Sequence, residues 1–69
     1  MNKTTITYLV IATPTVGSSE VIDTFERCDE AQARKEIETA NYPAHEGWNV
    51  EVLKKHVSPA GSTALYLIP

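Results

Sequence analysis

The sequence has few of the residue types that build disulfide frameworks, phosphate-binding loops or membrane spans. Of its 69 residues only Cys28 is a cysteine, so no internal disulfide can form. Small secreted domains usually reinforce a small core with several disulfides, and a single cysteine therefore favours the reducing cytoplasm. No apolar run approaches the roughly 20 residues of a membrane-spanning helix. We therefore expect a cytoplasmic protein that does not enter a membrane.

The first twelve residues, MNKTTITYLVIA, place one lysine before an apolar run, as secretory signals do. Such signals have an uninterrupted apolar core of about 7–15 residues and a cleavage site with small residues. Here Thr5 and Thr7 interrupt the run, and β-branched residues dominate it. The composition is typical of a strand, and we do not expect a signal peptide.

Positive charge is scarce and is not clustered. Six Lys and Arg residues stand against nine Asp and Glu residues, for a net charge of −3. Between Glu20 and Glu38 the chain carries seven acids and three bases, a local charge of −4. Binding to a phosphate backbone needs clustered Lys and Arg, so direct nucleic-acid binding is not expected. The acidic residues Glu20, Asp23 and Glu26 are instead candidate contacts for a basic partner protein.

Residues that could carry catalysis or bind a metal are few and scattered. Cys28, His45 and His56 are separated by 16 and 10 positions, which does not match the close ligand pairs of structural zinc sites. Cys28 stands next to the predicted helix, where a thiol can be activated, but no partner motif accompanies it. Gly17 and Gly47 are isolated and form no phosphate-binding loop. We expect no enzyme activity, no metal, no cofactor and no small-molecule substrate.

Four segments have the composition of strands. Residues 4–13 are rich in Thr, Ile, Val and Tyr, and both faces of this segment are largely apolar, which is typical of a central strand. Turn residues separate it from 20–27, whose charges are typical of an edge strand. Residues 48–57 and 63–68 predict two further strands, joined by the turn SPAGS. We expect Trp48 to close the core between helix and sheet.

One helix of about 11 residues is predicted between Asp29 and Asn41. Asp29 is a good N-cap, and Gln32 three residues later completes a capping box. Asn41 suits a left-handed position at the C-terminal end, and Pro43 discourages continuation through Tyr42. The apolar stripe of this helix, which a surface helix turns towards the core, consists of Ala33, Ile37 and Ala40.

The order β-β-α-β-β within a single domain, residues 1–69, predicts an α+β fold. In such a fold one helix packs on one face of a four-stranded, mainly antiparallel sheet. Two strand orders stay open. The apolar composition of the first and fourth strands favours 2-1-4-3 with a parallel centre, whereas the general preference for antiparallel pairing favours 2-1-3-4.

The third predicted strand ends in Lys54, Lys55 and His56. Successive residues of a strand point to opposite faces, so Lys54 and His56 share one face and Lys55 lies on the other. This arrangement does not form one basic cluster. We interpret the triplet as the solvated end of a strand whose lysines protect a sheet edge from aggregation.

A single helix can cover only one side of four strands, so apolar residues on the other side stay exposed. The residues assigned to the helix side are Leu9, Ile11, Val50, Val52 and Leu67. Alternation then places Tyr8, Leu53 and Tyr66 on the uncovered side. The assignment across the hairpin depends on the turn length, and a change of one residue would exchange the two faces. Exposed apolar patches often mark interaction sites, and tyrosine is a favoured anchor there. We expect these three residues to contact a partner protein or a second copy of the chain.

In length, acidity and β-β-α-β-β order, the chain resembles small phage proteins that inhibit host enzymes or bacterial defence complexes. Anti-CRISPR proteins are one example. The resemblance spans the whole chain and implies a non-catalytic, stoichiometric inhibitor or adaptor of a larger protein complex. Two alternatives stay open. One is a nucleic-acid-associated protein that uses Lys54, Lys55 and the aromatic residues, and the other is a structural homodimer.

Overall fold

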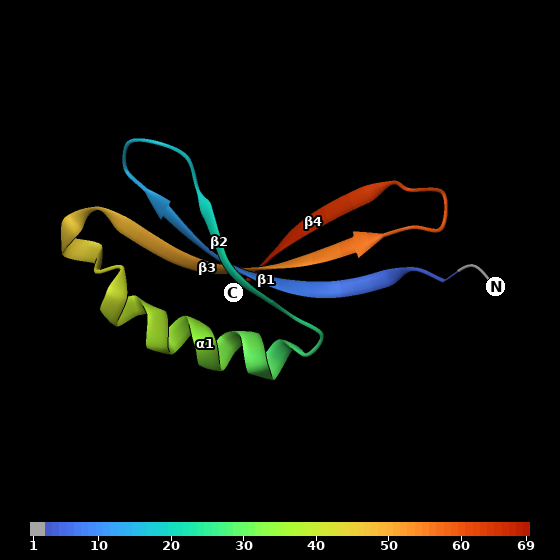
Figure 1. Cartoon of the computed structure of the whole chain (residues 1–69), viewed down its shortest axis with the longest axis horizontal. Helices are drawn as coiled ribbons and strands as arrows, with labels where there is room; N and C mark the ends of the chain where they lie inside the picture. Colours follow the sequence, from blue (N-terminus) through green and yellow to red (C-terminus); the bar gives the residue numbers. More distant parts are fainter. Residues whose placement is uncertain (1–2) are drawn as a thin grey trace.

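In a computed structural model, which describes residues 3–69, the chain forms a four-stranded antiparallel sheet and one α-helix (Figure 1). The helix α1 spans Cys28–Asn41, and a short 3-10 turn, η1 (Ala44–Glu46), leads from it into the third strand. The predicted α+β fold and its β-β-α-β-β order are confirmed. The strands are β1 (Thr5–Pro14), β2 (Glu20–Phe25), β3 (Trp48–Val57) and β4 (Thr63–Ile68).

The strands lie in the order β2-β1-β3-β4, and every neighbouring pair is antiparallel. The alternative 2-1-4-3 with a parallel centre is therefore wrong, and 2-1-3-4 is correct. The two ten-residue strands pair along their whole length, from Thr5 opposite Val57 to Pro14 opposite Trp48. This pairing forms a longer hydrogen-bonded ladder than the six-residue β4 could form with β1. The apolar composition of β4 was misleading because β4 lies at an edge.

Alternate residues of the two central strands meet the helix and form the core. Val10 lies opposite Val52 and Ala12 lies opposite Val50, and all four pack with Ala31 of α1 in one buried cluster. The half-buried residues around this cluster are Tyr8, Ile22, Phe25, Tyr42, Trp48 and Ile68. The rings of Trp48 and Tyr42 meet edge to face, with their centroids 4.9 Å apart. The expectation that Trp48 closes the core is confirmed.

The helix turns a different side to the sheet from the one predicted. Its buried residues are Ala31 and Glu38, whereas Ile37 is 62% exposed. Ala33 and Ala40 are exposed as well, so the predicted core stripe points to solvent. The small side chain of Ala31 lets the helix approach the central strands closely. Glu38 can be buried on this side because its carboxylate is paired with Arg34. An analysis of apolar periodicity alone does not reveal such a pair.

The helix also begins one residue earlier than the predicted cap. It starts at Cys28, and Arg27 in the N-cap position makes no side-chain capping hydrogen bond. Asp29 lies inside the first turn, where it accepts hydrogen bonds from the Arg27 guanidinium at 3.0 and 2.9 Å. The predicted Asp29 cap and its capping box are therefore wrong, because Arg27 engages the carboxylate. The helix ends at Asn41, as expected, but it has 14 residues rather than about 11. The left-handed position predicted for Asn41 is wrong, because no residue other than glycine has a positive φ among residues 3–69.

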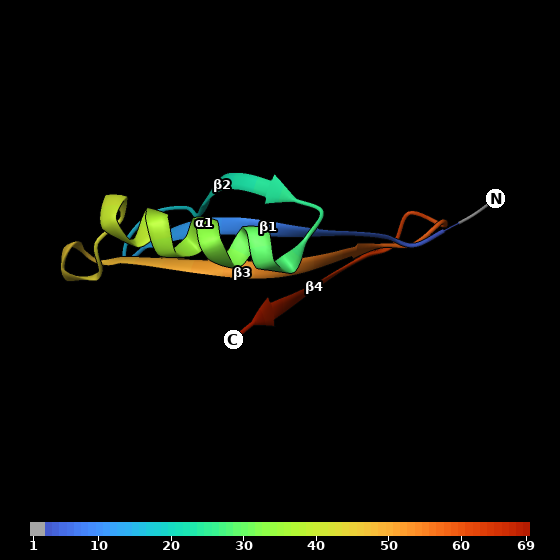
Figure 2. The same ribbon diagram turned by 90° about the horizontal axis from the view of Figure 1, so that it is seen from below.

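The helix covers one half of the sheet, and the other half extends beyond it. Figures 1 and 2 show α1 beside the C-terminal half of β1 and the N-terminal half of β3, with the β3–β4 turn at the opposite end. The molecule is elongated, with principal extents of 46 × 24 × 17 Å. Five of the six residues of β4 are exposed. Both faces of the sheet are therefore accessible at the end that contains the β3–β4 turn.

Truncation of a central core residue tests this packing. Val52 is completely buried against Val10 and Ala31. Replacing Val52 with Ala removes buried methyl groups and leaves a cavity, so we expect a loss of about 2 kcal/mol in the free energy of unfolding. Val16→Ala is the matched control, because Val16 is 87% exposed, and it should change stability by less than about 0.5 kcal/mol. Urea unfolding measures both, and equal effects would contradict the assignment of the core.

Candidate protein-interaction surface

The sheet register separates the three residues predicted to share a contact surface. Lys54 lies opposite Tyr8 on one side and opposite Tyr66 on the other, and residues directly opposite one another share a face. Because Tyr8 packs against the core, both tyrosines lie on the face that carries the helix. Leu53 lies on the opposite face. The prediction that all three residues share the uncovered face is wrong, and only Leu53 lies there.

The same register corrects the assignment of the other residues. Val50 and Val52 face the helix, as predicted. Leu9 and Leu67, however, both lie opposite Leu53 and share its face, and Ile11 lies two residues from Leu9 on the same side of β1. Their assignment to the helix side was off by one residue, which exchanges the two faces of a strand.

The turn between β3 and β4 contains the signal that determines this register. Gly61 has a φ of +89°, and its N–H donates to the Ser58 carbonyl at 2.9 Å. Ser58 N–H donates to the Ser62 carbonyl at 2.8 Å, which closes a three-residue hairpin loop. Three-residue loops of this kind carry glycine in the left-handed position. The letters SPAGS therefore specify that Val57 lies opposite Thr63, and the pairing of Leu53 with Leu67 follows.

On the helix side, beyond the end of α1, the sheet presents aromatic and basic side chains. Lys54 lies between Tyr8 and Tyr66, and the His56 ring meets Tyr66 edge to face with centroids 5.2 Å apart. Lys54 and His56 share a face and Lys55 lies on the other, as predicted. Their interpretation as protection of a sheet edge is wrong, because β3 is a central strand.

The face opposite the helix carries an apolar row across β1, β3 and β4, and the neighbouring pair of Ile11 and Val21 extends the apolar surface to β2. Leu9, Leu53 and Leu67 lie side by side on β1, β3 and β4, and Val21 lies opposite Ile11. Leu67, Val21 and Leu65 are 58%, 59% and 54% exposed. No segment within residues 3–69 packs over this row, because α1 lies on the other side. We call this surface the uncovered face: Leu9, Ile11, Val21, Leu53, Leu65 and Leu67.

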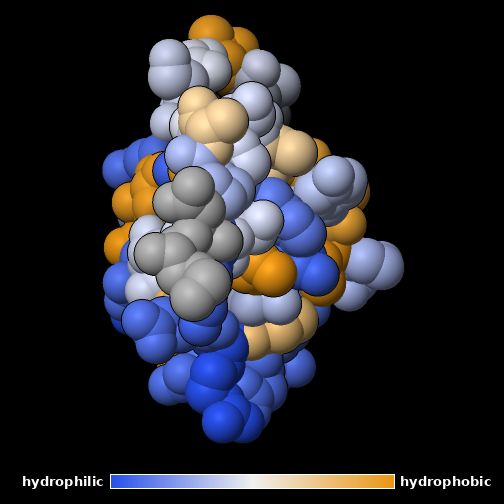
Figure 3. All heavy atoms as spheres, turned by 90° about the vertical axis from the view of Figure 1, so that its right-hand side faces the viewer, coloured by the Kyte–Doolittle hydropathy of each residue, from blue (hydrophilic) through white to orange (hydrophobic). Residues whose placement is uncertain are grey.

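Figure 3 views the molecule from the end that contains the β3–β4 turn. Hydrophobic residues reach the surface at several places in this view, between hydrophilic ones. Of the residues at this end, Leu65 and Tyr66 are more than half exposed. Apolar side chains are therefore exposed to solvent at more than one place at this end of the molecule.

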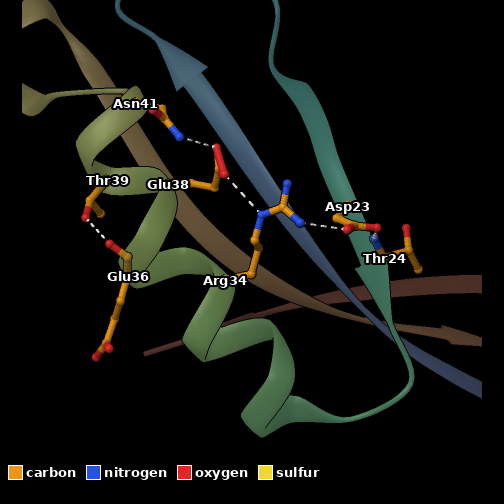
Figure 4. A network of polar contacts seen from close by, with 7 residues as sticks. All are labelled: Asp23, Thr24, Arg34, Glu36, Glu38, Thr39 and Asn41. Atoms are coloured by element: carbon orange, nitrogen blue, oxygen red, sulfur yellow. Dashed lines mark hydrogen bonds and ion pairs between the residues drawn. The ribbon is translucent and has the colours of Figure 1, made fainter.

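The three acidic candidates are not equivalent. Glu20 and Glu26 are exposed, whereas Asp23 is half-buried. The Asp23 carboxylate accepts a hydrogen bond from the Arg34 guanidinium at 2.9 Å, which ties β2 to the helix (Figure 4). Asp23 therefore has an intramolecular partner, and the acidic edge available to a partner protein consists of Glu20 and Glu26.

Arg34 joins Asp23 to a second carboxylate on the helix. Its Nε donates to Glu38 at 3.0 Å, and Asn41 Nδ2 donates to the other Glu38 oxygen at 3.2 Å (Figure 4). The hydrogen bonds from Asn41 and Arg34 lower the pKa of Glu38 below its ordinary value, against the opposing effect of burial. The network holds the half-buried side of α1 against β2 and explains why a charged residue can occupy a buried helix position.

Among residues 3–69, no group of three or more His, Cys, Asp or Glu side chains is placed to hold a metal ion. The described part of the chain has no detectable pocket, and its helix is too short and too polar to cross a membrane. Cys28 is a half-buried free thiol.

Comparison with protein-family models, with curated proteins and with solved structures gives no significant match.

The Glu38 network predicts a specific pH dependence of stability. A carboxylate whose pKa is lowered by folding stabilises the folded state above its unfolded pKa, and this contribution is lost as the pH falls through the folded value. We expect Glu38→Gln to reduce the loss of stability between about pH 5 and pH 3. Glu36→Gln is the control, because the Glu36 side chain points away from the network (Figure 4). Chemical unfolding across this pH range measures the effect, and equal slopes for the two variants would contradict the assignment.

Proposed function

We propose that the protein is a small, non-catalytic protein-binding module that docks a partner protein on its uncovered face. The observation that carries the proposal is the row of apolar side chains on the sheet face opposite the helix. Three of its members, Val21, Leu65 and Leu67, are more than half exposed. Contiguous exposed apolar surface of this kind is uncommon on proteins that bind nothing and often marks an interaction site.

The composition of the uncovered face supports a protein rather than a small ligand as the occupant. Leu9, Leu53 and Leu67 give it an apolar centre. Glu51 lies beside Ile11 and Lys55 lies beside Leu65, so charged residues of both signs border the apolar centre. An apolar centre with a polar rim is the usual composition of a protein–protein interface. Complete burial of one leucine contributes about 1.5–3 kcal/mol, so a few such residues could supply much of the binding energy.

The acidic edge supports a basic partner. Glu20, in β2, and Glu26, directly after it, are exposed near the edge of the sheet farthest from β4. Exposed charges near an interface mainly raise the association rate and discriminate against like-charged partners. A small acidic protein with such a face fits the role of a stoichiometric inhibitor or adaptor of a larger complex. The resemblance to phage inhibitors in length, acidity and element order points to the same role.

One arrangement favours a second candidate, association with a single-stranded nucleic acid. Lys54 lies between two tyrosines on a sheet surface, with His56 beside Tyr66. Aromatic rings flanked by basic groups are typical of surfaces on which bases stack. The net charge of −3 and the acidic β2 edge oppose the approach of a polyanion. We therefore rank this function below protein binding.

A matched pair of surface substitutions tests the proposed docking face. Val21 is 59% exposed on the uncovered face, and Ile37 is 62% exposed on the helix, on the other side of the molecule. We expect Val21→Lys to weaken binding by about tenfold or more, because it places a charge in an apolar contact. Ile37→Lys should bind like the wild type. The measurement is affinity capture with the tagged full chain, followed by titration of the purified partner.

Circular dichroism controls for folding of both variants. Loss of binding in Ile37→Lys and not in Val21→Lys would move the docking surface to the helix. Capture of nucleic acid that is lost at raised salt, with no protein retained, would favour the second candidate.

Reversal of the acidic edge tests its contribution to association. We expect the double variant Glu20→Lys, Glu26→Lys to slow association with a basic partner several-fold at low salt and to flatten the salt dependence of the rate. Asp23 stays unchanged because it holds Arg34. Glu36→Lys, an exposed change on the helix, is the control. Stopped-flow or surface-plasmon measurements give the rates, and equal rates for the double variant and the wild type would reduce these residues to solubilising charge.

A further inference from the structure

The two edges of the sheet differ in how they are protected against pairing with another strand. The β2 edge carries Glu20 and Asp23, and its register shifts at Ile22, between the partners of Val10 and Ile11. Charged residues and bulges are the usual protection of an edge strand. The β4 edge, Thr63–Ile68, contains no charged residue, no glycine and no proline, and five of its six residues are exposed. An exposed, neutral, apolar edge of this kind is a template for a further strand.

The backbone of β4 offers its free hydrogen-bonding groups at alternate residues. Ser58 and Ser62 form the hydrogen-bonded pair that closes the hairpin. Hydrogen-bonded and non-hydrogen-bonded pairs alternate along an antiparallel ladder. Ala64, Tyr66 and Ile68 therefore direct their N–H and C=O groups to β3. The remaining strand residues direct theirs away from the sheet, and these are Thr63, Leu65 and Leu67.

We infer that β4 pairs with β4 of a second copy of the chain, antiparallel, with Leu65 on the two-fold axis. Rotation about Leu65 maps the three outward residues onto one another, so that Thr63 pairs with the partner's Leu67 and Leu65 pairs with itself. A register one step further, centred on Tyr66, would pair Thr63 with Pro69, which has no N–H to donate. The Leu65-centred register is therefore the one that joins all outward groups within the strands.

The side chains of β4 suit this self-pairing. On the helix side, each large Tyr66 would lie opposite the small Ala64 of the other copy. On the uncovered face, Leu65 would meet its own copy, and the neutral strand brings no like charges together. The β2 edge could not pair with itself in this way, because its carboxylates would approach those of the second copy. The occupant that matches the β4 edge in charge, length and residue size is thus β4 itself.

A two-fold axis through the Leu65 pair is perpendicular to the sheet, so each face of one copy continues into the same face of the other. Both helices would lie on one side of an eight-stranded sheet, and the two uncovered faces would form one surface on the other side. The dimer does not depend on the proposed partner protein. It would, however, double the surface available to that partner.

Sedimentation velocity of the full chain over a range of concentrations tests the inference. We expect a concentration-dependent dimer in the wild type, weakened about tenfold or more by Leu65→Glu. The carboxylate introduced by Leu65→Glu would lie opposite Lys55 of its own chain, which favours folding, and opposite the same charge of the second copy, which opposes pairing. Ile37→Glu introduces the same charge at similar exposure on the helix and should dimerise normally.

The register has its own test, which also applies if Leu65→Glu fails to fold. Thr63→Lys combined with Leu67→Glu places opposite charges across the two copies and should retain the dimer. Thr63→Lys with Leu67→Lys, and Thr63→Glu with Leu67→Glu, place like charges there and should dissociate it. Equal dimerisation of all three double variants would overturn the Leu65-centred register.

The outcomes separate the dimer from the proposed function. A wild-type chain that stays monomeric at high micromolar concentration, or a dimer unaffected by Leu65→Glu, would overturn the pairing of β4. Val21→Lys is remote from β4 and should leave the dimer intact while it weakens partner binding. Loss of the dimer in Val21→Lys would place the self-contact at Val21, on the part of the uncovered face farthest from β4, and would overturn the β4 pairing.

Discussion

The structure depends on the full-length antiparallel pairing of β1 with β3. This pairing places Val10 opposite Val52 and Ala12 opposite Val50, and the four side chains form the floor on which Ala31 of the helix packs. Because direct partners share a face, the same register decides which side every other strand residue takes. The pairing of β1 with β3 therefore determines the core, the helix-side surface that carries Lys54 and the two tyrosines, and the uncovered face.

The helix is attached through a small residue and a polar network rather than through its apolar stripe. Ala31 provides the close contact, while Arg34 and Glu38 join the helix to Asp23 of β2. This attachment uses one of the three acidic residues at the β2 edge and leaves Ile37 in solvent. The polar network therefore shapes both the stability of the fold and the charge that is available to a partner.

The two edges of the sheet differ in charge and in protection, and this difference is relevant to binding. Acidic residues and a register shift mark β2, whereas β4 is neutral and exposed. The lysines expected to protect an edge lie one strand further in, on β3, and leave β4 unprotected. The molecule thus has one edge suited to electrostatic discrimination and another suited to strand pairing, with the apolar row of the uncovered face crossing the sheet between them.

The sequence by itself determined the features that short windows encode. Alternation and β-branched residues located the strands, Asn41 and Pro43 marked the end of the helix, and alternation alone separated Lys55 from Lys54 and His56. Only the tertiary structure decided the strand order, the side of the helix that is buried, and the separation of Leu53 from Tyr8 and Tyr66. These features depend on contacts between residues far apart in the chain, where a shift of one residue exchanges the two faces of a strand. The buried side of the helix also depends on the pairing of charged groups. Because Glu38 is paired with Arg34, a polar side of the helix packs against the sheet, whereas the apolar pattern alone predicted that a different side would be buried.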